Sequence, residues 1–379
     1  MTRRISLKIR LLVVCTLCFF SASYAQNNAD FKWFNPRLNT YATVKGKAWQ
    51  NTDSANYFTR IPTAAEKNVR EAVWNLAKNT AGEYLDFVTN AKQIRINYKV
   101  TGGKSMENMV TIGVSGVDLY AQDTKNNWHW VKGAYSFGDT ISFKYENFDS
   151  AVNIKKYRLY LPLYNTPKWL KIGVEKKFDF KVETADEKSP LVFYGTSIMQ
   201  GASASRPGLA WSNILGRKLN KPVINLGFSG NGRLEKPLID LINEIDAQLF
   251  VLDCQPNLHD KKTYSETEIE TRIVNAVNDI KQKHPKVPVL LVEHSGGLAK
   301  LNLDTELTGR YIWTSKILAN TYQKLKKEGN RNIFILTAEQ IGFTDESTID
   351  GTHPNDLGMM QYADAYQKII DKILRQKNK

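Results

Sequence analysis

A chain of 379 residues, 42% of them hydrophobic, is long enough to bury two hydrophobic cores rather than one. Its formal net charge of +14 favours contact with polyanions, which include acidic polysaccharide, nucleic acid and anionic membrane. No long block of like charges forms a basic arm, so we expect no nucleic-acid partner and interpret the charge mainly as a contribution to solubility.

Residues 1–25 have the pattern of a secretory signal peptide. A basic start is followed by the apolar run LLVVCTLCFF and the small-residue stretch SASYAQ, which predicts cleavage after Ala25. The apolar run is too short to span a bilayer and no second candidate follows, so no membrane span is expected. Cleavage removes four basic residues and no acidic one, which lowers the net charge from +14 to +10. The mature protein is predicted to be secreted or periplasmic.

Cleavage also leaves a single cysteine. Cys15 and Cys18 are lost with the signal peptide, so the remaining Cys254 cannot form an intramolecular disulfide. Cys254 ends the apolar run LFVLDC, and we expect it to be a small buried hydrophobic residue rather than a reactive thiol.

Residues 26–185 carry the signature of an antiparallel β-sandwich of jelly-roll type. Apolar and polar residues alternate over short segments that glycine, asparagine and aspartate separate, namely QIRINYKV (93–100), VTIGVSGVDLYA (110–121), TISFKY (140–145) and KYRLYLPLY (156–164). One helix is expected at VREAVWNL, after a capping-box pattern of Thr63 and Glu66. Trp128 and Trp130 alternate onto one face of a predicted strand, where they could stack on sugar rings but more often fill a core.

Residues 186–379 change to a repeated order of strand, turn and helix. The polar stretch VETADEKSP (182–190) has the composition of a linker. Five apolar runs follow, LVFYG, PVINLGFS, LFVLDC, VPVLLVEH and NIFILTAE, with helix-like segments between them and a last helix over about 355–375. This pattern predicts a three-layer α/β/α domain with a parallel, flavodoxin-like sheet, whose functional site lies past the carboxyl ends of the strands.

Polar residues and glycines follow the first three of these runs. Ser197 comes after LVFYG, Gly227, Gly230 and Gly232 come after the second run, and Asn257 comes after the third. Each has an ordinary structural explanation, because serine caps helices, glycine permits tight turns and asparagine caps turns. None of the three segments is decisive alone.

The segment DGTHPND (350–356) supplies a carboxylate and an imidazole. Asp350 and His353 lie three residues apart, so the carboxylate can accept the Nδ1 proton and leave Nε2 to take a proton from a serine. Alone, Asp350 would be a turn residue and His353 a surface cap. With Ser197, the glycines and Asn257, they converge on one edge of one sheet.

This ordered set resembles the four sequence blocks of the SGNH/GDSL hydrolases. GTSI, SGN, Asn257 and DGTHPN match the blocks in order, and the resemblance covers roughly residues 190–375. The upstream half resembles the β-sandwich that precedes a subset of these enzymes, marked by Gly-x-Asp-Leu-Tyr at residues 116–120. Two departures are that Thr196 stands in place of the usual aspartate and that DCQPN lacks its trailing aspartate.

The resemblance implies a serine esterase that removes acetyl or other small acyl groups from a glycan. Ser197 would be the nucleophile, His353 the base and Asp350 its orienting carboxylate. The backbone N–H groups of Ser197 and Gly230, with the side-chain amide of Asn257, would form the oxyanion hole.

Further histidines are weaker candidates, and the sequence points to no cofactor. His259 follows Asn257 closely and could contact substrate, while His294 ends VPVLLVEH and is more often a structural residue in such a place. No H-E-x-x-H or Cys/His spacing, P-loop or dinucleotide fingerprint is present, so we expect neither a metal nor a cofactor.

Two alternatives stay open. A non-catalytic glycan-binding protein could use the same fold, although the intact Ser197, His353 and Asp350 speak against it. An acyltransferase could use the same three residues and pass the acyl group to a sugar hydroxyl. Product analysis with an added alcohol acceptor separates this reaction from hydrolysis.

Overall fold

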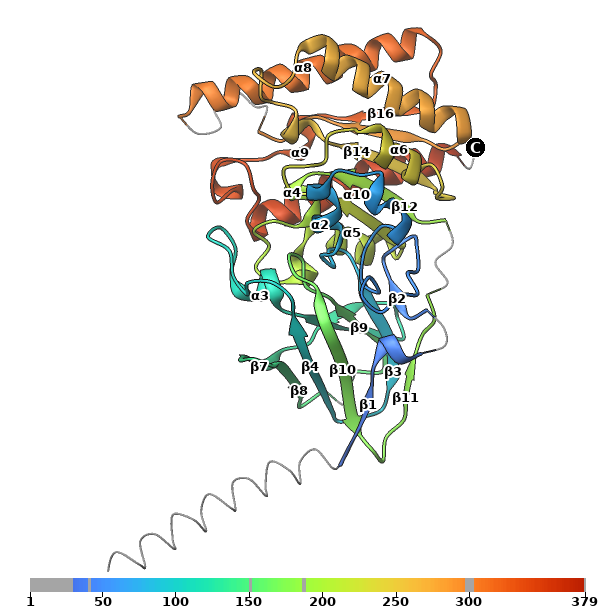
Figure 1. Cartoon of the computed structure of the whole chain (residues 1–379), viewed down its shortest axis with the longest axis vertical. Coiled ribbons are helices and arrows are strands. Elements are labelled where there is room, and N and C mark those ends of the chain that lie inside the picture. Colours follow the sequence, from blue (N-terminus) through green and yellow to red (C-terminus); the bar gives the residue numbers. More distant parts are fainter. Residues whose placement is uncertain (1–29, 40–41, 150–151, 186–188, 297–302, 378–379) are drawn as a thin grey trace, which may run out of the picture.

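The computed structural model describes residues 30–377 apart from 40–41, 150–151, 186–188 and 297–302 (Figure 1). The predicted signal peptide and the middle of the predicted linker therefore lie outside the described residues.

Two antiparallel sheets form the N-terminal half. The first has the strand order β1-β10-β4-β8-β7 and the second β11-β3-β9-β5-β6, with β2 paired to β3. The strands are β1 Phe31–Phe34, β2 Val44–Lys45, β3 Tyr84–Thr89, β4 Gln93–Val100, β5 Asp118–Asp123, β6 Trp128–Trp130, β7 Gly133–Phe137, β8 Ile141–Glu146, β9 Ile154–Tyr160, β10 Pro167–Glu175 and β11 Phe180–Val182. Strand β4 alternates as predicted, with Ile94, Ile96 and Tyr98 buried between the sheets. The half is a β-sandwich.

Two sequence predictions for this half were wrong. Residues 110–121 are not one strand, because Thr111–Ser115 form helix α3 and β5 begins only at Asp118. Gly113 packs so closely that a Cβ there would lie 2.2 Å from the carbonyl oxygen of Ala204, so a distant contact overrides the local alternation. The capping box is also absent: Thr63 donates its hydroxyl to Asp53 at 2.8 Å, and the helix begins only at Glu71.

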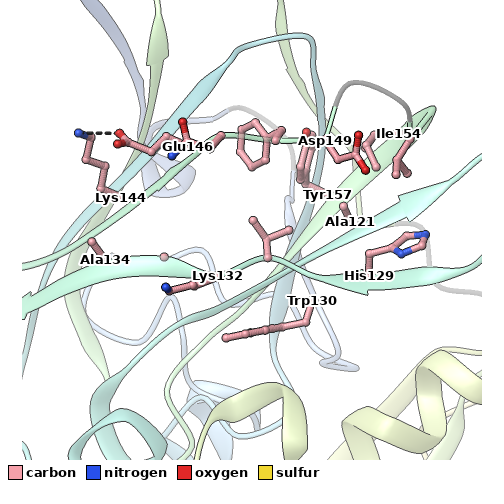
Figure 2. Close-up of a pocket in the computed structure, with 15 residues that line it drawn as sticks. Ala121, His129, Trp130, Lys132, Ala134, Lys144, Glu146, Asp149, Ile154 and Tyr157 are labelled. Carbon is pink, nitrogen blue, oxygen red and sulfur yellow. Dashed lines mark ion pairs between the residues drawn. The ribbon is translucent and has the colours of Figure 1, made fainter.

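Short helices occur around the sandwich. They are η1 Pro36–Leu38, η2 Thr63–Lys67, α2 Glu71–Ala77 and α3 Thr111–Ser115. Of the two tryptophans of β6, Trp130 is among the residues that line a hollow of about 570 Å³ in the sandwich, and Trp128 is not (Figure 2). Figure 2 shows the ring of Trp130 on the opposite side of its strand from Tyr157, which lines that hollow. Trp128 packs against buried tyrosines instead of the sandwich core, so neither ring belongs to the main core.

The C-terminal half is a parallel sheet in the order β13-β12-β14-β15-β16. Its strands are β12 Leu191–Gly195, β13 Val223–Gly227, β14 Leu249–Asp253, β15 Val289–Val292 and β16 Ile333–Leu336. Its helices are α4 Ser197–Gln200, η3 Pro207–Leu209, α5 Trp211–Leu219, α6 Lys236–Ile242, η4 Gln255–Asn257, α7 Glu266–Lys283, α8 Thr305–Lys327, α9 Ala338–Ile341, η5 Asp345–Ser347 and α10 Asp356–Lys377. Helices α5 and α10 share one core with the sheet, and α6, α7 and α8 share the other, which gives the three predicted layers.

Cys254 follows β14 and is buried with 1% of its surface exposed. Its sulfur lies 3.8 Å from the carbonyl oxygen of Tyr194. This confirms the predicted small buried residue, and burial raises the pKa of its thiol well above the usual value.

The Gly-x-Asp-Leu-Tyr segment joins the two halves. Oδ2 of Asp118 accepts hydrogen bonds from Arg206 at 2.6 Å and from the backbone N–H of Gly208 at 2.9 Å. Oδ1 accepts one from the indole of Trp130 at 2.8 Å. The guanidinium of Arg206 also lies over the Tyr120 ring, 5.4 Å from its centroid. The motif therefore fixes the segment that follows helix α4.

We predict that Asp118→Asn lowers the free energy of unfolding by about 3 kcal/mol, because it leaves the charge of Arg206 unbalanced in a largely buried place. Urea unfolding measures this. The matched control is Asp240→Asn, which breaks an exposed i,i+4 ion pair with Lys236 and should cost less than about 0.5 kcal/mol. We call the contact of Asp118 with Arg206 and Gly208 the clamp. Equal losses of unfolding free energy in the two variants would show that the clamp does not stabilise the protein.

Candidate active site

The carboxyl ends of three neighbouring strands bring the candidate residues together. Gly195 of β12 pairs with Gly227 of β13 on one side and with Asp253 of β14 on the other. The segments that follow these residues, which contain Ser197, Gly230 and Asn257, therefore leave the sheet at one edge.

The turn that presents Ser197 is tight. Thr196 is extended, Ser197 begins the one-turn helix α4, and Gly201 ends it with φ of 103°. A Cβ on Gly195 would lie 2.8 Å from the carbonyl oxygen of Asp253, so a larger residue does not fit before the turn. As the first residue of a helix, Ser197 has a backbone N–H without a partner in the helix.

Ser197, His353 and Asp350 form a hydrogen-bonded chain. Oγ of Ser197 lies 2.8 Å from Nε2 of His353, and Nδ1 of His353 lies 2.7 Å from Oδ2 of Asp350. The backbone N–H of His353 donates to the other carboxylate oxygen at 2.8 Å. The carboxylate thus holds both the ring and the backbone of the histidine, and leaves Nε2 to accept the hydroxyl proton.

Asp350 stays ionised at neutral pH. Partial burial alone would raise the pKa of its carboxyl, but hydrogen bonds from His353, together with the backbone N–H of Thr352 at 3.0 Å, lower it to about 2. The Ser197 residue is buried, with 7% of its surface exposed. The imidazole of His353 therefore lies between a charged carboxylate and a buried hydroxyl.

The glycines after β13 have separate structural reasons. Gly230 has φ of 67°, and no atom lies within 4 Å of the place where its Cβ would be, so it adjoins open space. A Cβ on Gly232 would lie 1.8 Å from the carbonyl oxygen of Gly195. We call residues 227–232 the glycine block. It combines a left-handed turn with backbone in contact with the turn before Ser197.

Asn257 lies against the glycine block. Its amide nitrogen is 3.3 Å from the carbonyl oxygen of Gly232 and 3.5 Å from that of Phe228. Both contacts are long, so the amide is lightly held against the glycine block. The backbone around it, which the departure from the usual motif left undefined, is the short helix η4.

Thr196, the residue in place of the usual aspartate, is buried. Its hydroxyl has no hydrogen-bond partner among the described residues.

His259 and His294 meet at Tyr311 of α8. The His294 ring stacks on Tyr311 with centroids 3.6 Å apart, and the His259 ring meets it edge-on at 5.2 Å. The Tyr311 hydroxyl lies 2.5 Å from the hydroxyl of Thr352. The two histidines therefore connect to the loop that carries His353, although wholly buried His294 is better placed for support than for substrate contact.

His294 is neutral. Burial lowers the pKa of its imidazole well below the usual value, and the nearby charges of His259 and His353 lower it further. The backbone N–H of Gly296 donates to Nδ1 at 3.0 Å, so the neutral ring carries its proton on Nε2. Burial, with the charge of Arg310, also lowers the pKa of His259.

Two residues of this site, Gln200 and Tyr311, were not predicted from the sequence. Gln200 accepts the backbone N–H of Ser229 at 3.0 Å, and its position one helical turn after Ser197 could have indicated this. Tyr311 comes from a helix without a motif, so no local signal pointed to it.

Two absences apply to the described residues. No group of three or more His, Cys, Asp or Glu side chains in that part of the chain could hold a metal ion. None of its helices is long and apolar enough to cross a membrane.

Two known protein families match successive parts of the chain. Residues 188–371 match the GDSL-like lipase/acylhydrolase family, and residues 31–180 match the N-terminus of SGNH-hydrolase-type esterases. The crystal structure of a protein from Bacteroides ovatus, described as a GDSL-like lipase, is 31% identical with a TM-score of 0.79, and the match covers 91% of this chain and 98% of that one. The chain belongs to the SGNH/GDSL hydrolases and carries their Gly-x-Asp-Leu-Tyr sandwich.

More distant structures share the fold. A salicylyl-acyltransferase from a tetracycline biosynthetic pathway is 18% identical with a TM-score of 0.68, and the match covers 91% of this chain and 98% of that one. A family two carbohydrate esterase from Cellvibrio japonicus is 11% identical with a TM-score of 0.54 and the same two coverages. No curated protein matches the chain.

We predict that the His294 ring stays neutral from pH 8 down to pH 5, because its pKa lies well below the usual value. Its imidazole C–H resonance, assigned by its loss in His294→Asn, should keep one chemical shift over this range. A titration midpoint inside the range would show that the ring is hydrated rather than buried.

Proposed function

We propose that this protein is a secreted serine esterase that removes acetyl or other small acyl groups from carbohydrate. The observation that carries the proposal is the hydrogen-bonded chain from Ser197 through His353 to Asp350 at the edge of the parallel sheet. Membership of an acylhydrolase family supports the ester substrate.

Acylation begins at Ser197. Its hydroxyl oxygen attacks the ester carbonyl carbon while Nε2 of His353, 2.8 Å away, takes the hydroxyl proton. Asp350 stabilises the imidazolium that forms, because its low pKa keeps it charged throughout. The tetrahedral intermediate then collapses, the bond to the sugar oxygen breaks, and His353 passes the proton to that oxygen.

The negative oxygen of the intermediate needs donors. The backbone N–H groups of Ser197 and Gly230 have no acceptor among the described residues, and the lightly held amide of Asn257 lies against the glycine block, which contains Gly230. These three groups form the proposed oxyanion hole. Water then attacks the acyl-enzyme with His353 again as base, which releases the carboxylic acid.

Carbohydrate as the substrate rests on one prediction from the sequence and on the shared fold. The predicted signal peptide would place the protein where polysaccharides occur. Structures with the same fold include a family two carbohydrate esterase and an acetyl xylan esterase from Butyrivibrio proteoclasticus with a TM-score of 0.51. A panel of acetylated polysaccharides, with released acetate as the readout, identifies the glycan.

Transfer of the acyl group is the second candidate. It is favoured by the fold shared with the salicylyl-acyltransferase, since both reactions use one acyl-enzyme and differ in the acceptor. Incubating the protein with an ester donor and an alcohol acceptor, then identifying the product, separates the two. If a new ester were the main product, the activity would be acyl transfer rather than hydrolysis.

We expect the mature protein to hydrolyse an aryl acetate at neutral pH with chelator present, and Ser197→Ala to abolish this, because the nucleophile is lost. Release of the phenol is the measurement. Ser136→Ala, an exposed serine of the sandwich, is the matched control and should keep full activity. Activity that survives in Ser197→Ala would sink the proposal.

Asp350→Asn and Asn257→Ala test the supporting groups. We expect kcat to fall by about 10³- to 10⁴-fold in the first variant. The imidazolium loses its charged partner, and the neutral imidazole is no longer held with its proton on Nδ1. In the second it should fall by about 10²- to 10³-fold through loss of one oxyanion donor. Asn75→Ala, at an exposed position of α2, is the control for side-chain truncation. An unchanged kcat in Asn257→Ala would remove it from the oxyanion hole.

A further inference from the structure

We propose that Arg60, which belongs to the N-terminal half, is a positioning residue for the reaction. It holds the glycine block so that the backbone N–H of Gly230 points at the developing oxyanion. The inference rests on the proposed function and assigns a catalytic contribution to the half of the chain that carries no reacting group.

The guanidinium of Arg60 grips the end of strand β13. Nη1 donates to the carbonyl oxygens of Asn225 at 2.9 Å and Gly227 at 2.8 Å. The guanidinium carbon also lies 4.9 Å from the centroid of the Phe228 ring. Arg60 therefore contacts the backbone of Asn225 and Gly227 and the side chain of Phe228, which are the end of β13 and the start of the glycine block.

Arg60 itself is fixed from the other side. Nε donates to the carbonyl oxygen of Asn79 at 2.8 Å, and Nη2 donates to that of Leu76 at 2.9 Å. The backbone N–H of Arg60 donates to Ala77 at 2.8 Å. One side chain therefore ties the end of helix α2 to the end of β13.

Burying the guanidinium of Arg60 costs free energy of folding, so a contribution to stability alone does not explain it. Arg60 is 1% exposed, and all four acceptors of its side chain are neutral carbonyls rather than a carboxylate. Burial lowers the pKa of its guanidinium to about 10, although the charge of Glu83 opposes the change. An apolar side chain would fill the space at lower cost, but it could not fix the direction of two peptide carbonyls.

The rest of the glycine block depends on the same anchoring. The backbone N–H of Phe228 donates to Gly195 at 3.0 Å, and that of Ser229 donates to Gln200 at 3.0 Å. Gln200 in turn donates to the carbonyl oxygen of Leu163, in the N-terminal half, at 3.3 Å. Positions 227, 228 and 229 each have a fixed partner, which leaves Gly230 to extend into the open space described above.

The consequence is kinetic. A displacement of a positioned group by about 1 Å can cost about 10²-fold in rate, because oxyanion donors act only when they meet the transition state. Binding of the substrate in the ground state does not use the hydrogen bond from the backbone N–H of Gly230. Loss of Arg60 should therefore lower kcat and leave KM nearly unchanged.

The test uses Arg60→Lys in the full chain, because lysine keeps the charge but cannot reach carbonyls on two elements at once. We expect kcat for aryl acetate to fall at least 10-fold with KM changed less than threefold. The matched control is Arg37→Lys, since Arg37 also donates to a backbone carbonyl, at Pro167 (2.9 Å), and lies over a phenylalanine, Phe58. It belongs to the sandwich and should leave both constants unchanged.

Hydrogen exchange supplies a readout that needs no esterase activity. In Arg60→Lys, amides of peptide 226–233 should exchange faster than in the wild type, while those of β12 keep their rates. If the wild type shows no hydrolysis that Ser197→Ala abolishes, the proposed function fails, and the exchange data still decide whether Arg60 holds the block. Unchanged exchange in this peptide, or equal kcat in the two proteins, would overturn the inference.

Loss of folding is handled by a second variant. If Arg60→Lys does not melt cooperatively, Arg60→Gln, which is neutral and keeps amide donors, takes its place with the same expectations. If neither variant folds, Arg60 is a folding residue and the positioning role is rejected.

Discussion

The site depends on backbone touching backbone where strands β12 and β13 end. A side chain at Gly227 would lie 2.3 Å from the backbone nitrogen of Gln200, and one at Gly232 would lie 1.8 Å from the carbonyl oxygen of Gly195. These close approaches place the glycine block against the backbone on both sides of Ser197. The proposed oxyanion donors, the backbone N–H groups of Ser197 and Gly230, therefore belong to two segments in contact that follow different strands.

The two halves of the molecule divide the work between chemistry and geometry. All groups proposed to react or to bind the oxyanion come from residues 197–353, whereas Arg60 and Asp118 of the N-terminal half hold the end of β13 and the segment that follows helix α4. Both side chains are buried and charged, so removing one of their partners should cost several kcal/mol of folding stability, ~3 to 5. Two segments close to the nucleophile turn are thus held by the N-terminal half of the chain, which is therefore part of the site's architecture.

The sequence predicted the sheets and the contact of Asp350 with His353 because their signals are local. Alternation marks β4, apolar runs mark β12 to β14, and Asp350 and His353 are three residues apart. Helix α3 was missed because Gly113 responds to Ala204, a residue about ninety positions away. Arg60 and Tyr311 act through backbone carbonyls and a ring stack, and such contacts exist only once the halves have met. No spacing in the sequence encodes them.

The clamp at Asp118 also limits how such enzymes can be recombined. Its carboxylate accepts from a side chain and from a backbone N–H in η3, and also from Trp130 in its own sheet. A sandwich taken from another member would have to present the carboxylate at the same height above η3, or Arg206 would be left without its counter-charge. Chimeras of the two halves should therefore succeed only when the sandwich and the segment after the nucleophile are exchanged together.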